Sequence, residues 1–180
     1  MCSLSLVAVS LSDRQAFECI KHNPLLAKLD AYGFSHEAIC LVNSSLENKQ
    51  QRVKINGLFS TYKQFSLGVP QGSVIGPLFF HIYINDLLLC IQDTDICNYA
   101  DDTTMYACDK NLDNVTGRFV IDSSTIIQWF ADNYMKLNTD KCHLMELGRN
   151  PNQQVTAIIG NSVVKSTEEE KLLGVVIDKN

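Results

Sequence analysis

The chain has 180 residues, of which 46% are hydrophobic and 19% are charged, and its formal net charge is -5. This hydrophobic fraction excludes a disordered tail, because disordered chains combine low hydrophobicity with high charge. The length predicts one ordinary domain or a piece of a larger one. Taken for the whole chain, the acidic balance argues against binding of nucleic acid, because proteins that bind it usually carry a basic face.

The cysteines and the apolar stretches of the chain indicate in which cellular compartment the protein is expected. Seven cysteines are scattered along the chain without any Cys-x-x-Cys pair, a pattern typical of a reducing, intracellular protein of the nucleus or the cytoplasm. The longest apolar stretch, residues 78–91, is interrupted by His81, Asn85 and Asp86. It is shorter than the roughly 20 apolar residues that a membrane span requires, so we expect no contact with a membrane.

The first half of the chain predicts a strand, two helices and a hairpin. Residues 7–11 are rich in Val and Leu and predict a strand. Asn23-Pro24 begins a predicted helix that ends near Gly33, and Ser35 is placed to cap a second helix. The segment 51–65 alternates apolar and polar residues around Asn56-Gly57, which is the strongest short-range signal of a β-hairpin.

The second half predicts a mixed pattern in which hairpins replace parallel crossovers. A loop rich in Gly and Pro leads into a helix that runs from about residues 74–77 to Cys90. Strands at 96–99 and 104–108 flank a turn at 100–103, and a helix follows over 112–134. Short strands are expected at 142–147, 155–159, 162–165 and 172–177. This order favours the α+β class, with helices packed on one face of an antiparallel sheet.

Two features could carry chemistry. Asp101 and Asp102 are adjacent at a predicted hairpin turn, where their carboxylates repel each other unless a cation neutralises them. The second feature is the loop Gly68–Pro77, which has three glycines and two prolines in ten residues. Glycines allow a ligand to approach the backbone, and a helix that follows such a loop attracts phosphate at its N-terminus. Each feature alone is also consistent with an ordinary turn or loop.

Together the two features resemble the palm of a reverse transcriptase, most closely the non-LTR (LINE-like) retrotransposon group. The resemblance rests on ordered blocks that cover roughly residues 7–178. These blocks are AFECIKH at 16–22, GVPQGSVIGPL at 68–78, YINDL at 83–87, YADD at 99–102, WFADNYMKLNTDK at 129–141 and KLLGVVID at 171–178. The last of them is similar to the primer-grip segment of that family.

The resemblance implies an RNA-directed DNA polymerase, a nucleotidyltransferase that uses Mg²⁺ (or Mn²⁺). In this family palm carboxylates hold two metal ions that activate the primer 3′-hydroxyl and stabilise the leaving pyrophosphate. Asp101 and Asp102 match two of these metal ligands, and Lys141 matches a lysine proposed to protonate the pyrophosphate. The implied partners are an RNA template, a DNA primer and a dNTP.

The same resemblance assigns three residues to substrate binding. Phe17 matches the bulky residue that packs near the nucleotide sugar, and Gln71 and Gly72 match the loop that lines the nucleotide and template site. From the residues alone, the preferred interpretation of Phe17 is a core aromatic, and that of Lys141 is a solvated lysine at a strand edge.

The first block departs from the family pattern. The family has an aspartate four residues before Ala16, and this chain has Ser12 there. Asp13 is one residue out of register, which in a strand turns its side chain to the other face. Glu18 replaces a second aspartate. Because a serine hydroxyl is a poor substitute for a metal-binding carboxylate, we expect this chain to be catalytically impaired.

The blocks present also predict which part of the enzyme the chain represents. No segment matches the fingers or the thumb, so we expect residues 1–180 to be a palm fragment in which those parts are absent or truncated. Two alternatives remain open from the sequence. One is a non-catalytic remnant that binds nucleic acid or a partner, and the other is a remnant without a selected function.

Overall fold

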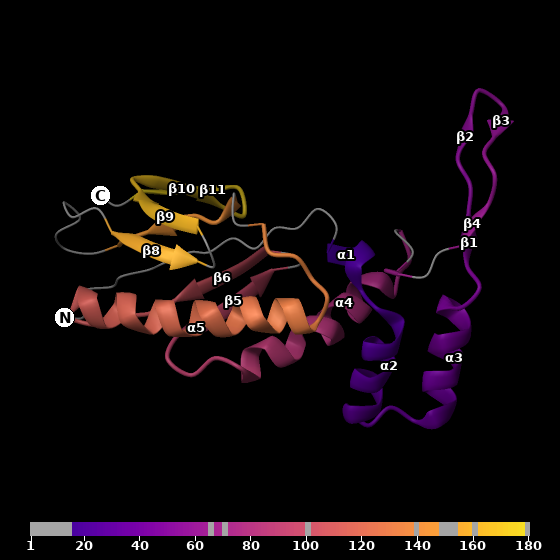
Figure 1. Ribbon diagram of the computed structural model, residues 1–180, viewed down its shortest axis with the longest axis horizontal. Helices are drawn as coiled ribbons and strands as arrows, with labels where there is room; N and C mark the ends of the chain where they lie inside the picture. Colours follow the sequence, from indigo (N-terminus) through magenta and orange to yellow (C-terminus); the bar gives the residue numbers. More distant parts are fainter. Residues whose placement is uncertain are drawn as a thin grey trace. The chain divides into compact units, whose positions relative to one another are not determined.

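The computed structural model describes residues 16–64, 67–69, 72–99, 102–138, 141–147, 155–159 and 162–178 (Figure 1). The chain forms two compact units. Over the described residues, the helical unit comprises residues 16–85 and 133–135, and the sheet unit comprises residues 86–132 and 136–178. The strand predicted at 7–11 lies outside the described residues.

The helical unit is built from α1 (Ala16–Cys19), α2 (His22–Ala31), α3 (His36–Leu46) and α4 (Gly76–Ile84). The predicted cap of α3 is confirmed, because Ser35 Oγ accepts a hydrogen bond from the Ala38 amide at 3.3 Å. Helix α2 packs against both α3 and α4. Its residues Leu25 and Leu29, four positions apart on one face, are fully buried, so α2 is the centre of this unit.

Tyr83 ties α4 to the rest of the helical unit. Its side chain is fully buried, and its hydroxyl donates to the Asn133 carbonyl at 2.8 Å. Lys28 of α2 donates to the Tyr83 carbonyl at 2.6 Å. The helix predicted to continue to Cys90 instead ends at Ile84 and tightens into a 3₁₀ helix over Asn85–Leu89. A last turn that tightens in this way is a common end for an α-helix.

The predicted hairpin around Asn56-Gly57 is confirmed. Strand β1 (Gln50–Gln51) pairs with β4 (Lys63–Gln64), and β2 (Lys54–Ile55) pairs with β3 (Leu58–Phe59), both antiparallel. Asn56 and Gly57 have φ values of 49° and 84°. Positive φ at both central residues is the requirement of a two-residue type I′ turn. The hairpin extends away from the end of α3 (Figure 1).

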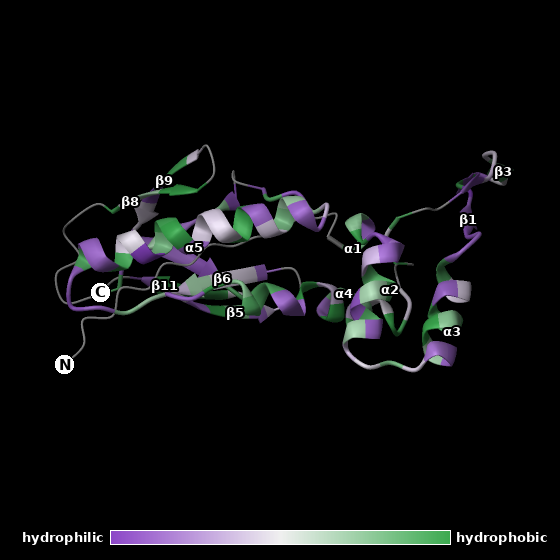
Figure 2. Ribbon diagram, turned by 60° about the horizontal axis from the view of Figure 1, so that its bottom comes forward, coloured by the Kyte–Doolittle hydropathy of each residue, from purple (hydrophilic) through white to green (hydrophobic). Residues whose placement is uncertain are grey.

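The sheet unit contains one long helix and short strands. Its elements in chain order are β5 (Asp95–Tyr99), β6 (Asp102–Tyr106), α5 (Leu112–Asp132), β7 (Leu144–Met145), β8 (Thr156–Ile159), β9 (Ser162–Thr167), β10 (Glu169–Leu172) and β11 (Val175–Asp178). Helix α5 packs against β8. Its hydrophobic and hydrophilic residues are interleaved along the sequence (Figure 2), and the buried ones include Val115, Phe119 and Ile126. Their helical spacing forms one apolar stripe.

The α+β class is confirmed, but the prediction of a single antiparallel sheet is wrong for the described residues. The strands form several small sheets, in which β8 and β9 pair antiparallel while β7 and β9 run parallel. Parallel neighbours need a long connection between them, and the segment 146–161, which includes β8, supplies it.

The predicted single strand over residues 172–177 is also wrong, because the segment folds into the β10–β11 hairpin. Leu172 pairs with Val175, and the two residues between them, Leu173 and Gly174, have φ values of 50° and 86°. Glycine adopts this left-handed conformation without penalty, and a two-residue turn with positive φ closes a tight hairpin.

A buried carboxylate holds the entry to β5. Asp122 of α5 is 2% exposed. Its Oδ2 accepts hydrogen bonds from the Asp93 and Thr94 amides at 3.0 and 2.7 Å and from the Thr94 hydroxyl at 2.7 Å. Its Oδ1 accepts from the Gln92 amide at 3.4 Å. Hydrogen bonds to a charged carboxylate are stronger than those between neutral groups, so Asp122 fixes the turn that starts the β5–β6 hairpin.

The start of α5 is held by a second carboxylate. The Asn111 amide donates to Asp109 Oδ1 at 3.0 Å, and this bond holds the pKa of Asp109 below its usual range, with a smaller contribution from Arg118. Arg118 Nη2 lies 3.1 Å from Asp109 Oδ2.

Among the described residues, no helix combines the length and the apolar character that crossing a membrane requires.

Gly117 is expected to weaken α5. It lies inside the helix with a negative φ, and a Cβ added there would meet nothing within 4 Å. Gly117→Ala should therefore raise the free energy of unfolding by about 0.5–1 kcal/mol, because glycine loses more backbone entropy on folding. Thermal denaturation followed by circular dichroism measures this change.

The matched control for Gly117→Ala is the same substitution at a turn. Gly174 also has open space around it but has a φ of 86°. Gly174→Ala should lower stability by about 1–2 kcal/mol, the penalty of a left-handed alanine. Equal changes in stability at both positions would show that backbone conformation does not determine the effect of replacing these glycines with alanine.

Candidate functional site

The β5–β6 hairpin positions Asp102. Tyr99 pairs with Asp102 across the hairpin, so Asp102 is the first residue of β6 and is half-buried. The predicted turn over residues 100–103 is wrong, because Asp102 and Thr103 already belong to the strand. The connection has only the two residues that a tight hairpin needs. Asp101 is one of them and lies outside the described residues.

Lys141 and Asp102 line the same small cavity of about 160 Å³ in the sheet unit. The other residues that line it are His143, Glu170, Lys171, Leu172 and Leu173. They come from the β6 start, from the segment leading into β7 and from the β10–β11 hairpin. The structure therefore brings together two residues predicted for catalysis and the segment that resembles a primer grip.

A contact between a histidine and a glutamate fixes one wall of this cavity. His143 Nδ1 lies 3.3 Å from Glu170 Oε2, and the Thr167 hydroxyl lies 3.4 Å from the same oxygen. The Thr167 hydroxyl also donates to the Leu144 carbonyl at 3.3 Å. These contacts link β10 to the segment of Lys141 and β7. His143 and Glu170 were not predicted from the sequence, although His143 is two residues after Lys141, the spacing that places side chains on one face of an extended chain.

The cavity offers a carboxylate and ammonium groups together. Mg²⁺ prefers oxygen ligands and is usually bound by one or two carboxylates together with substrate phosphates. Asp102 provides one such carboxylate, and Lys141 and Lys171 provide positive charge for phosphate oxygens. The donor chemistry therefore fits a Mg²⁺-bound triphosphate. Within the described residues, no three His, Cys, Asp or Glu side chains are grouped to hold a metal ion.

Phe17 lies in the helical unit, against α4 and the glycine loop. Its ring centroid is 4.8 Å from that of Phe80, and its carbonyl accepts from the Val69 amide at 3.0 Å. The Gly68 amide donates to the Ile20 carbonyl at 2.6 Å. The start of the Gly68–Pro77 loop is thus bonded to the backbone around α1, and Phe17 is half-buried beside it.

Gly72 continues the same loop. It is exposed and has a φ of 79°, and a Cβ added there would meet nothing within 4 Å. Ser73 Oγ accepts from the Gly76 amide at 3.1 Å, which connects the loop to the start of α4. Gln71 lies outside the described residues. Phe17 and Gly72 belong to the helical unit, whereas Asp102 and Lys141 belong to the sheet unit.

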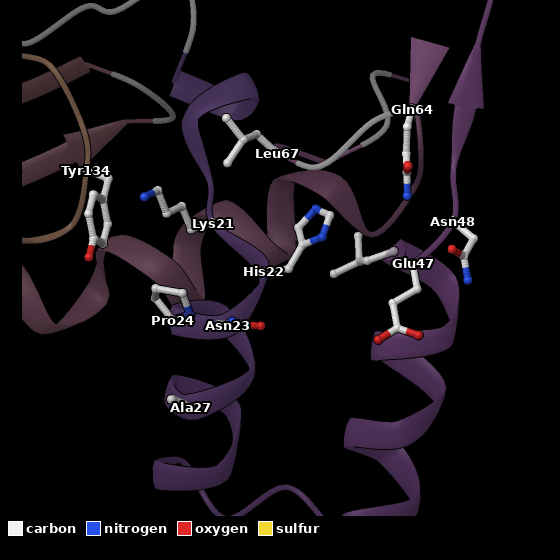
Figure 3. Close-up of a pocket in the computed structure, with 11 residues that line it drawn as sticks. Lys21, His22, Asn23, Pro24, Ala27, Glu47, Asn48, Gln64, Leu67 and Tyr134 are labelled. Carbon is white, nitrogen blue, oxygen red and sulfur yellow. The ribbon is translucent and has the colours of Figure 1, made fainter. Parts of the chain in front are cut away.

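A larger pocket of about 1080 Å³ lies in the helical unit (Figure 3). His22 projects into it and donates through Nε2 to the Gly68 carbonyl at 2.9 Å. Lys21 lies 3.3 Å from the centroid of the Tyr134 ring, so its charge already has an aromatic partner. None of the predicted site residues lines this pocket. The contact of His22 with Gly68 supports the start of the Gly68–Pro77 loop.

Comparison with known proteins gives the family. Residues 4–177 match the family model described as "Reverse transcriptase (RNA-dependent DNA polymerase)". The chain is 26% identical to the RNA-directed DNA polymerase from mobile element jockey of Drosophila melanogaster over 96% of this chain and 20% of that protein. It is 26% identical to the probable RNA-directed DNA polymerase from transposon BS of the same species over 96% of this chain and 20% of that protein.

A third relative is a polyprotein. The chain is 24% identical to the retrovirus-related Pol polyprotein from type-2 retrotransposable element R2DM of Drosophila melanogaster, over 95% of this chain and 17% of that protein. The chain thus spans about a fifth of the length of the curated relatives it matches. The family model covers nearly all of the chain. The chain belongs to the reverse transcriptase (RNA-dependent DNA polymerase) family, in its non-LTR retrotransposon group.

Proposed function

We propose that residues 1–180 are the palm portion of a non-LTR retrotransposon reverse transcriptase. In this proposal Asp101 and Asp102 bind Mg²⁺ (or Mn²⁺) together with the triphosphate of an incoming nucleotide. The observation that carries it is the cavity shared by Asp102, Lys141 and the β10–β11 hairpin. A carboxylate and a lysine on one cavity are the groups that a metal-bound triphosphate requires.

The chain's own residues have separate roles in this proposal. When bound, the divalent cation would supply Lewis acidity at the phosphates and at the primer 3′-hydroxyl. Asp101 and Asp102 orient it, since carboxylates are its preferred ligands. Lys141 donates a hydrogen bond, and then a proton, to the leaving pyrophosphate. The His143–Glu170 pair keeps β10 against the segment that carries Lys141.

The family resemblance implies three further substrate contacts. Phe17, packed on Phe80, would contact the nucleotide sugar, while Gln71 and Gly72 would line the nucleotide and template site. The substrates are then a dNTP, a DNA primer and an RNA template. The resemblance to the family supports these roles, and Gly72 is exposed and open enough for close approach of a ligand.

We further propose that this chain does not extend a primer by itself, because Ser12 stands where the family has its first metal-binding aspartate. The test is a primer-extension assay of the purified chain with an RNA template, a DNA primer, dNTPs and Mg²⁺. We expect no extension above that of Asp101→Ala. Extension by the natural chain that disappears in Asp101→Ala would disprove the impairment.

A substitution at position 12 tests the cause of the impairment. Ser12→Asp should tighten the Mg²⁺-dependent binding of a fluorescent dATP analogue by about tenfold, because it adds a charged ligand for the cation. Ser12→Asn is the matched control, since it has a similar shape without the charge. Equal binding by Ser12→Asp and Ser12→Asn would show that position 12 does not face the metal site.

A further inference from the structure

The segment Asn48–Gln64 has a charge opposite to that of the whole chain. It carries Lys49, Arg52, Lys54 and Lys63, which are four of the chain's fifteen lysine and arginine residues. No aspartate or glutamate occurs between Asn48 and Asn85. Every residue of the segment is exposed. A chain of net charge -5 thus concentrates positive charge on one hairpin, which we call the basic hairpin.

A bulge places two aromatic rings around one arginine of the basic hairpin. Between the pairs Gln51–Lys63 and Lys54–Phe59, one strand has two residues and the other has three. An extra residue of this kind redirects side chains along a strand. The guanidinium carbon of Arg52 lies 3.8 Å from the Phe59 ring centroid and 4.8 Å from that of Tyr62.

The bulge is held by bonds within the hairpin itself. The Ser60 amide donates to the Val53 carbonyl at 2.9 Å, and the Val53 amide donates to Ser60 Oγ at 2.9 Å. Lys54 adds a second cation, with Nζ 5.2 Å from the centroid of Phe59. Arg52, Lys54, Phe59 and Tyr62 therefore form a connected cluster on a folded hairpin.

The chemistry of this cluster matches a single nucleic-acid strand. A guanidinium stacked on rings keeps its N–H donors in its own plane, where they can reach phosphate oxygens. Phe59 is 51% exposed and Tyr62 is 58% exposed, so both rings have surface left on which an unpaired base can stack. Basic residues interleaved with exposed aromatics are the usual means of binding single strands without sequence preference.

We propose that the basic hairpin binds single-stranded nucleic acid, through phosphate contacts of Arg52, Lys54 and Lys63 and base stacking on Phe59 and Tyr62. The residues of this surface are different from those proposed to bind metal and nucleotide, and its action needs neither a divalent cation nor Asp102. The proposal therefore goes beyond the proposed function and can fail or succeed separately from it.

The test is fluorescence anisotropy of the full chain with labelled oligo-uridine RNA of about 12 nucleotides, in EDTA. The double variant Lys54→Gln/Lys63→Gln should weaken binding by roughly tenfold and lower the salt slope by about 1.4, because each phosphate contact on a single strand contributes about 0.7. Lys110→Gln/Lys165→Gln removes the same charge from exposed positions elsewhere and should leave the affinity nearly unchanged.

The aromatic part of the proposal has its own variant. Phe59→Leu should weaken binding by roughly tenfold, because it removes a stacking surface while keeping an apolar side chain. Circular dichroism verifies that each variant folds.

Several outcomes would overturn the proposal. These are no RNA binding by the natural chain, equal weakening by the two lysine pairs, or binding of duplex RNA as tight as that of the single strand. Oligothymidine in place of oligo-uridine distinguishes RNA from DNA, and equal binding of both supports a surface that reads phosphate and base faces. Hairpin variants that all bind RNA normally would show that RNA binds elsewhere on the chain.

Discussion

Gly68→Ala is expected to lower the free energy of unfolding by about 3–5 kcal/mol. A Cβ at this position would lie 2.7 Å from Glu18 Cα and 2.7 Å from the Phe17 carbonyl oxygen. Both are backbone atoms, so relief requires movement of α1 itself. Gly68 also has a φ of 76°, a conformation that adds a further penalty for alanine. The measurement is urea denaturation followed by circular dichroism.

Gly72→Ala is the matched control for this prediction. Gly72 has a φ of 79°, nearly the same as Gly68, but open space around it. It should therefore show only the conformational penalty, about 1–2 kcal/mol. If Gly68→Ala and Gly72→Ala are equally destabilising, the close packing of the loop against α1 is wrong. The comparison separates backbone strain from steric contact in the motif that first suggested the family.

Asp122→Ala is the second substitution with a large expected effect, a loss of about 3 kcal/mol. It removes the acceptor of the amides of Gln92, Asp93 and Thr94 and of the Thr94 hydroxyl. Gln92 and Asp93 are exposed, so water can replace the carboxylate at their amides, but Thr94 is 8% exposed. A buried donor that loses its hydrogen-bond partner lowers the free energy of unfolding more than an exposed donor, because water cannot replace the partner. Thermal and urea denaturation measure the loss.

Ser123→Ala tests whether any buried polar residue of α5 would have the same effect. Ser123 is the neighbour of Asp122 and is 5% exposed, but its hydroxyl bonds to the Val120 carbonyl of its own helix. Its replacement should change stability by less than about 1 kcal/mol, because such local bonds compete with the helix itself. Asp122→Ala with an equally small effect would show that the carboxylate does not hold the β5–β6 hairpin.

Local sequence signals predicted the parts of the fold that local physics determines. The cap at Ser35 and the turn at Asn56-Gly57 each depend on a few neighbouring residues, and both are present. Asp102 was correctly assigned to the β5–β6 hairpin, although strand β6 begins at Asp102, two residues earlier than predicted. The helix α5 was recognised from the spacing of its apolar residues.

Long-range arrangement could not be predicted in the same way. Nothing in the local sequence determines that β7 pairs in parallel with β9, because strand partners are chosen by packing across the unit. The turn at Leu173-Gly174 was missed because Leu at a positive φ is uncommon, and the segment looks like one apolar strand. Missing this turn also hid the cavity wall formed by Glu170 and Lys171.

The net charge is a poor guide to nucleic-acid binding for a related reason. A total of -5 says nothing about where charges gather, and the basic hairpin shows that one exposed segment can have the opposite sign to the whole chain. The run without acidic residues from Asn48 to Asn85 is visible in the sequence and would have revealed it. For proteins that bind nucleic acid, the distribution of charge is more informative than the sum.

The central claim is that the cavity of Asp102 and Lys141 binds a nucleotide with a divalent cation. The most direct test is titration of a fluorescent dATP analogue into the full chain with Mg²⁺ and with EDTA. The proposal predicts Mg²⁺-dependent binding that Asp102→Asn and Lys141→Gln each weaken by about tenfold or more, as expected for loss of a charge-assisted contact. Asp95→Asn, an exposed carboxylate of the same hairpin, should leave binding unchanged. Binding that is independent of Mg²⁺, or unaffected by Asp102→Asn, would contradict the claim.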